Sequence, residues 1–229
     1  IGSIDSTGSV NTDAGFSIMS YTGTGSVETF AHGLNSAPEL VILRNREVAS
    51  NWWVWGELLG NNQIMELDTT SAKYNPNGNY HNDTMPTSSV ISIGSDGQVS
   101  GNGQSHICYA FHSVQGYSKF SSYIGGGSNF PFIYTGFKPA FMMVKRAVGG
   151  TGSWAITDGK RDPFNAVDNY LSANNANAES DFDHADFLSN GIKFRTNNDG
   201  WNLSGDTYIY MAFASNPLVT SSGVPATAR

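Results

Sequence analysis

Charged side chains are scarce in this sequence. Only 14% of the 229 residues are Asp, Glu, Lys or Arg, whereas an ordinary soluble domain has about 25%. The net charge is −7, and the sequence contains no cluster of lysine or arginine. A surface that neutralises nucleic-acid phosphates is therefore not expected, and the acidic balance disfavours anionic membranes.

Cysteine and long apolar runs are also lacking. The single cysteine, Cys108, cannot form an internal disulfide and has no companions for a zinc site. The longest apolar stretches, in PELVILRNR and AFMMVKR, are strand-sized, whereas a membrane helix needs roughly 20 residues. No basic region followed by an apolar region opens the chain, so no signal peptide is predicted. We expect no membrane insertion and a buried Cys108.

Glycine and aromatic residues are plentiful instead. The chain has 26 glycines, and 12% of its residues are aromatic, which is too much apolar surface for a disordered chain. A polar but uncharged surface is typical of strand-and-turn proteins, lectin-like folds and phage fibres. The opening IGSIDSTGSVNTDAG is interpreted as a linker or cut N-terminus over residues 1–14, so the chain is expected to be a C-terminal fragment.

An internal repeat organises the rest of the chain. The segment GFSIMSYTGTGS from Gly15 matches GYSKFSSYIGGGS from Gly116, and HGLNSAPELVILRN matches TGFKPAFMMVKR. The matched positions are Tyr21 and Tyr123, Gly33 and Gly136, Pro38 and Pro139, Trp53 and Trp154, Gly103 and Gly205, Ala110 and Ala212, and Phe111 and Phe213. This order predicts a duplication.

Both copies have the pattern of β-strands. In SHICYAFH, Ile107, Tyr109 and Phe111 alternate with smaller or polar residues, which is a period of two. Turn signals such as NPNG, SDGQ and NNDG separate the apolar runs. The Asn-rich segment 166–188 is predicted to be a long loop with at most one short helical turn.

The predicted fold class is therefore all-β, with helix below about 10%. We expect two tandem, antiparallel β-sandwich units that are lectin-like or jelly-roll-like. The first unit is predicted at 15–115, the second at 116–217, and a C-terminal tail at 218–229.

No catalytic constellation is evident. A glycoside hydrolase needs two carboxylates about 5–10 Å apart. Glu57 could approach Glu66 or Asp68 in the first copy, but no acidic pair recurs in the second. Neither a G-x-S-x-G elbow nor a metal-binding histidine spacing occurs. The protein is predicted not to be an enzyme.

One acidic group resembles a metal site. Asp181, Asp183 and Asp186 lie close together in ESDFDHADFL, and oxygen ligands at spacing two are typical of calcium loops. The turn glycine and closing glutamate of an EF-hand are missing. A calcium or magnesium site and a solvated acidic loop both remain open, and no other cofactor is predicted.

Tryptophans are the remaining functional signal. The repeat pairs Trp53 with a tryptophan of the second copy, which marks Trp53 as core and leaves Trp52 as the exposed residue of NWWVWGE. Trp52 beside Asn51, and Trp201 beside Asn202 at a predicted hairpin tip, are candidate glycan-binding residues, because an indole face can stack on a sugar ring. The alternative is a surface or interface tryptophan with no ligand.

Taken together, DAGFSIMSYTGTGS, HGLNSAPELVILRNR, NWWVWGELLG, YTGFKPAFMMVKR, DFLSNGIKFRT, TYIYMAFASNP and GVPATAR resemble a known family. The resemblance is to a repeated domain of uncharacterised function near the C-termini of large virion proteins of marine phages, including cyanophages. It covers nearly the whole chain. It implies a tail-fibre, baseplate or particle-surface role, a virion location that is extracellular after host lysis, other virion proteins as partners, and a homo-oligomer with a trimer favoured.

Two functions remain open at this point. One is host attachment through a bacterial surface glycan, which the tryptophans and the Asn-rich loops favour. The other is a purely structural spacer or decoration module, which the duplication favours, because stacking a unit extends a fibre without a site. A polysaccharide-degrading enzyme is a distant third.

Overall fold

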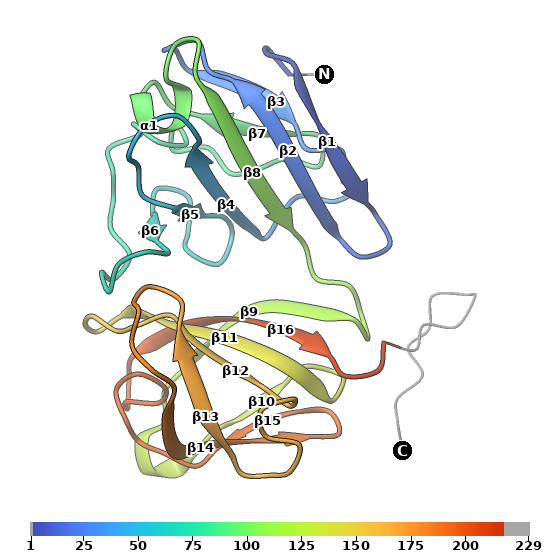
Figure 1. Cartoon of the computed structure of the whole chain (residues 1–229), viewed down its shortest axis with the longest axis vertical. Coiled ribbons are helices and arrows are strands. Elements are labelled where there is room, and N and C mark those ends of the chain that lie inside the picture. Colours follow the sequence, from blue (N-terminus) through green and yellow to red (C-terminus); the bar gives the residue numbers. More distant parts are fainter. Residues whose placement is uncertain (1, 218–229) are drawn as a thin grey trace. The chain divides into compact units, whose positions relative to one another are not determined.

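The computed structural model describes residues 2–217 and is nearly all β (Figure 1). Among the described residues, the helices are α1 (Gly97–Ser100), four residues long, and the 3-10 turn η1 (Gly127–Asn129), three residues long. The predicted all-β, antiparallel fold class is confirmed. Residue 1 and the predicted tail at 218–229 lie outside the described residues.

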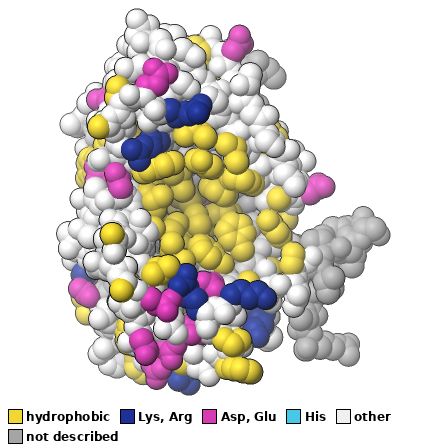
Figure 2. Space-filling model, in the orientation of Figure 1, with side chains coloured by type: hydrophobic (Ala, Val, Ile, Leu, Met, Phe, Trp, Pro, Cys, Tyr) yellow, Lys and Arg dark blue, Asp and Glu magenta, His cyan; other side chains and the backbone are white. Residues whose placement is uncertain are grey.

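The chain forms two compact units. The first contains residues 2–67 and 73–112, and the second contains residues 113–217 together with the short segment 68–72. The boundary between the units thus falls after His112, near the predicted division at Gly116. Uncharged atoms cover most of the face drawn in Figure 2, and the charged side chains on it lie in separate groups.

The first unit pairs a large sheet with a small one. The small sheet consists of β3 (Glu28–Ala31) and β7 (Val90–Ile93). Apolar side chains from both sheets, including Phe30 and Cys108, form one buried cluster. The large sheet has the order β1-β2-β8-β4-β5-β6 and is built from β1 (Ser6–Asn11), β2 (Phe16–Thr22), β4 (Leu40–Asn45), β5 (Trp53–Trp55), β6 (Met65–Glu66) and β8 (Ser105–Phe111).

The predicted linker at 1–14 is wrong for most of its length. Within it, β1 pairs with β2 over all six of its residues, and the Ser6 hydroxyl donates to the Ala31 carbonyl at 2.7 Å. The side chains of β1 are nearly all exposed. Its sequence, STGSVN, therefore needs no alternation of apolar and polar residues and shows none. An edge strand held by main-chain hydrogen bonds leaves little trace in an apolar pattern.

Cys108 provides a direct check on the first core. It lies fully buried on β8, and burial raises the pKa of its thiol. Because the thiolate is the nucleophile, we expect Ellman's reagent to label the native chain at least about a hundredfold more slowly than the urea-unfolded chain. Comparable labelling rates in the two states would contradict this packing.

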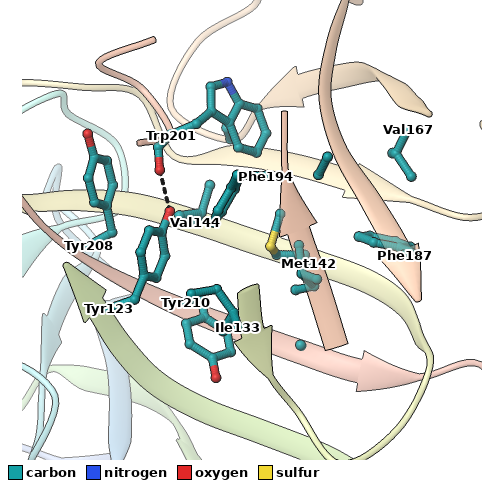
Figure 3. Close-up of a cluster of buried hydrophobic side chains, with 14 of the residues drawn as sticks. Tyr123, Ile133, Met142, Val144, Val167, Phe187, Phe194, Trp201, Tyr208 and Tyr210 are labelled. Atoms are coloured by element: carbon teal, nitrogen blue, oxygen red, sulfur yellow. Dashed lines mark hydrogen bonds between the residues drawn. The ribbon is translucent and has the colours of Figure 1, made fainter. Parts of the chain in front are cut away.

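The second unit is a single eight-stranded antiparallel sheet with the order β10-β15-β14-β13-β12-β11-β16-β9. Its core cluster includes Tyr123, Met142, Phe194 and Trp201 (Figure 3). The strands are β9 (Ser118–Ile124), β10 (Phe132–Tyr134), β11 (Pro139–Val148), β12 (Ala155–Asp158), β13 (Val167–Ser172), β14 (Ser180–Leu188), β15 (Gly191–Phe194) and β16 (Thr207–Ala214).

The Asn-rich segment is not the predicted long loop. It forms β13 and β14, and residues 173–179 connect these strands. β13 pairs with β12 on one side and with β14 on the other. This long-range pairing overrides the low strand propensity of the Asp and Asn residues in VDNYLS.

Several features recur in both units. The Tyr21 hydroxyl donates to the Val99 carbonyl at 2.5 Å, and the Tyr123 hydroxyl donates to the Trp201 carbonyl at 2.5 Å, 102 positions further along the chain for both partners (Figure 3). The strand order β2-β8-β4-β5 in the first unit corresponds to β9-β16-β11-β12 in the second. These correspondences support the tandem repeat, which stays a prediction.

Candidate functional site

Trp52, the first predicted ligand-binding residue, lies just before β5 and is half-buried. The guanidinium carbon of Arg44 lies 5.1 Å from the centroid of its ring, and the Tyr109 ring lies 6.1 Å away. Asn51 is half-buried, and its carbonyl accepts a hydrogen bond from the Ser50 hydroxyl at 3.1 Å. Arg44 therefore lies over the indole ring that a sugar would need for stacking.

Trp201, the second candidate, was predicted to be exposed, and this is wrong. Its side chain is only 2% exposed, because the imidazole of His184 stacks on it with ring centroids 4.1 Å apart. The ring of Tyr170 meets it edge-on at 5.5 Å. Figure 3 shows the indole nitrogen on the side away from Tyr123 and Phe194. The face of Trp201 that His184 covers is thus closed to a sugar ring.

Asn202 is also buried, contrary to its predicted place at an exposed tip. Its amide nitrogen donates to the carbonyls of Gly127 at 2.8 Å and Thr196 at 2.7 Å. Its amide oxygen accepts from the Gly126 backbone N–H at 2.7 Å. Because these bonds use both ends of the amide, Asn202 holds loops together rather than presenting a group to a ligand.

The three predicted metal ligands lie on β14. Asp181 and Asp183 are exposed, and the Asp186 carboxylate accepts from Arg195 Nε at 2.9 Å. Within residues 2–217, no group of three or more His, Cys, Asp or Glu side chains is arranged to hold a metal ion. The geometry therefore gives the calcium or magnesium hypothesis no support.

A polar groove of about 220 Å³, here called the amide groove, opens in the second unit. Its lining comes from β12, β13, β14 and the segment before β12, from the connection 173–179, and from the turn that ends at Trp201. Trp201 thus belongs to a groove with polar neighbours, although its ring is mostly covered. The lining residues are Gly152, Ser153, Ala155, Tyr170, Ser172, Asn175, Asn177, Ala178, Ser180, Asn198, Asp199, Gly200 and Trp201.

The local turns fix the amides of this groove. The Asn198 side-chain oxygen accepts from the Gly200 N–H at 2.8 Å, and the Asn175 oxygen accepts from the Asn177 N–H at 3.0 Å. Both are turns in which the asparagine caps its own backbone. Since each oxygen is used in this way, the NH₂ groups are the parts available to a ligand. The Asp199 carboxylate is 64% exposed; one of its oxygens lies 3.5 Å from Arg146 Nη1, and the other is an acceptor for a ligand.

A second pocket of about 450 Å³, here called the lysine pocket, also lies in the second unit. No sequence pattern pointed to it; the only available signal was an aromatic residue inside the turn KRDPFNA. Its lining residues are Lys138, Pro139, Ala140, Gly159, Lys160, Asp162, Pro163, Phe164, Asn165, Phe187, Ser215 and Asn216.

The carboxylate in the lysine pocket is held by hydrogen bonds. Asp162 accepts from the backbone N–H of Asp168 at 3.2 Å, and from the backbone and side-chain nitrogens of Asn169 at 2.9 and 2.6 Å. Burial alone would raise the pKa of Asp162, but these hydrogen bonds lower it overall. Asp162 is therefore ionised at neutral pH.

The fold and these grooves define an all-β protein of two compact units. The chain belongs to the family described as "Domain of unknown function (DUF7483)", whose model matches residues 1–217. This range runs through both units. No curated protein and no solved structure matches the chain. None of the helices among residues 2–217 has the length and apolar character needed to cross a bilayer.

Proposed function

We propose that this protein is a non-enzymatic attachment module of a phage particle, which binds a neutral glycan of the bacterial surface through the amide groove. The observation that carries the proposal is the gathering of asparagine amides, serine hydroxyls and one carboxylate in the lining of a single groove. The virion location rests on the motif resemblance alone.

The chemistry of the amide groove suits an uncharged sugar. Sugar hydroxyls both donate and accept, so they pair with amide NH₂ groups, with serine hydroxyls and with the Asp199 carboxylate. Tyr170, which is half-buried, adds apolar surface for the C–H groups of the sugar ring. Because Trp201 is 2% exposed and His184 covers a face of it, the ring supports the groove from beneath, and the sugar stacking predicted from the sequence is not part of this proposal.

A structural spacer is the second candidate function. It is favoured by the matching hydrogen bonds and strand orders of the two units, because a repeated core extends a fibre without a ligand. In either role the proposed partners are other virion proteins and copies of the same chain. A homotrimer is favoured, and light scattering of the purified protein would detect it.

A glycan array with bacterial surface saccharides tests the attachment proposal. The double variant Asn175→Ala/Asn177→Ala removes two exposed amides of the groove. If each contact contributes about 1 kcal/mol, binding should weaken about tenfold or more. The matched control is Asn129→Ala, an exposed amide of the same unit outside the groove. The spacer function is favoured if the wild type binds no glycan, or if the double variant binds as well as the control.

A further inference from the structure

We propose that the lysine pocket is a separate binding site for an acidic sugar, which is a pyranose carrying one carboxylate. This site shares no lining residue with the amide groove. The proposal therefore does not depend on the neutral-glycan function and is tested with different probes.

Most of the cations in the second unit already have partners within the fold. Residues 113–217 contain eight Lys and Arg residues. Five are engaged: Arg146, Arg161 and Arg195 in ion pairs, and Lys145 and Lys193 with backbone carbonyls. Within the described part of the chain, no hydrogen bond or ion pair holds the side chains of the remaining three, Lys119, Lys138 and Lys160.

Two of these three unpaired lysines line the same pocket. The lining carries two ammonium groups, from Lys138 and Lys160, against the single carboxylate of Asp162. It is thus locally positive in a chain whose net charge is −7. Asp162 is 9% exposed and already accepts three hydrogen bonds from its own unit. It forms no ion pair with either lysine among the described residues, so both ammonium groups are available to an anion.

An exposed aromatic ring lines the same pocket as these two lysines. Phe164 is 83% exposed, which costs free energy unless a partner covers it. Phe187 and Pro139 add buried apolar surface to the same lining. A sugar ring offers a C–H face to the phenyl ring while its carboxylate reaches the ammonium groups. A free inorganic anion would use the lysines and leave Phe164 exposed.

Hydrogen bonds hold the backbone of the pocket walls in place. The Ser215 N–H donates to the Lys138 carbonyl at 2.9 Å, which ties the residue before β11 to the end of β16. The Asn165 side chain bonds the backbone of Phe187 twice, as donor at 3.1 Å and as acceptor at 2.9 Å. Asn165 therefore supports the wall rather than the ligand. Because the backbone of the pocket is already formed, the ordering cost of binding falls mainly on the two exposed lysine side chains.

The test is titration of the whole chain by calorimetry or NMR with D-glucuronate, with neutral D-glucose as the matched probe. We expect glucuronate to bind about tenfold tighter than glucose, and raised salt to weaken its binding. Glucuronate that binds no better than glucose would overturn the proposal. Tighter binding of glucose 6-phosphate than of glucuronate would also overturn it, because a phosphate site would then be indicated.

Variants locate the binding. Lys138→Gln/Lys160→Gln should weaken glucuronate binding about tenfold without changing the affinity for glucose. Phe164→Ala should weaken the binding of both sugars about threefold, because both present a C–H face to the ring. The control is Lys119→Gln, the third unpaired lysine, which lies outside the pocket. An equal loss in the Lys119→Gln variant, or no loss in the double variant, would show that the pocket is not the site. Neutral glycans on the array should bind the double variant as well as the wild type, which separates this proposal from the amide-groove proposal.

Discussion

Replacement of Trp201 by alanine is expected to lower the free energy of unfolding of the second unit by about 3–5 kcal/mol. The side chain is 2% exposed and belongs to the core cluster of that unit. Its loss would leave a cavity beside His184 and Tyr170, whose rings lie 4.1 and 5.5 Å from it. It would also loosen the turn whose carbonyl accepts from the Tyr123 hydroxyl.

Trp52→Ala is the matched control for this prediction. Trp52 is half-buried in the first unit and covered by Arg44, so its removal should cost only about 1 kcal/mol. Urea unfolding followed by far-UV circular dichroism measures both variants without relying on tryptophan fluorescence. If the two units unfold in separate transitions, each variant should shift only its own. Equal costs for the two variants would contradict the burial of Trp201.

These two tryptophans show what the sequence could and could not predict. Trp53 was correctly assigned to the core, because the repeat pairs it with another tryptophan. Trp201 was misplaced because local turn residues predict an exposed tip. The groups that bury it, the His184 ring and the Tyr123 strand, lie 17 and 78 positions away. Local patterns carry no information about such distant partners.

Strand prediction succeeded and failed for similar reasons. The runs LVIL and FMMV were correctly predicted as strands, since they lie in β4 and β11 and apolar runs of this length are typical of buried strands. β13, β14 and the edge strand β1 were missed, because half or more of the residues in each are polar. Their stability comes from pairing with neighbours, which an apolar pattern does not record.

The two candidate sites also differ in how far the sequence predicted them. The Asn-rich segment indicated the region of the amide groove, because it contains more asparagines than a turn requires. The lysine pocket left no comparable signal. The pocket is recognised from lysines that have no partner in the folded chain. The sequence does not distinguish Lys138 and Lys160 from the buried Lys145.

Acidification below pH 6.5 is expected to destabilise the protein through its buried histidines. His32, His81, His106 and His184 are each at most 1% exposed. Burial lowers the pKa of all four from the ordinary value of 6.5. Hydrogen bonds with backbone carbonyls oppose this effect without reversing it, as does the charge of Asp162 near His184.

The sign of the effect follows from proton linkage. The folded histidines bind protons less readily than the unfolded ones. The protein therefore keeps its full free energy of unfolding above pH 6.5 and loses part of it as the pH falls toward the lowered pKa values. Each histidine can lower the free energy of unfolding by at most about 1.4 kcal/mol for each pH unit. Between pH 6.5 and pH 5 the four together can therefore lower the free energy of unfolding by at most about 8 kcal/mol.

Carboxylates do not account for a loss in that window. The pKa values of Asp158 and Asp162 lie below the ordinary 3.8, so their contributions disappear only at more acidic pH. The measurement is urea unfolding at half-unit pH steps from 7.5 to 5, with His184→Gln as the test variant. This neutral replacement should be less stable at pH 7.5, because it loses the stacking on Trp201, yet its pH slope should be shallower by about one histidine's share. A flat profile in the wild type, or an unchanged slope in the variant, would show that these histidines remain able to take up protons in the folded protein.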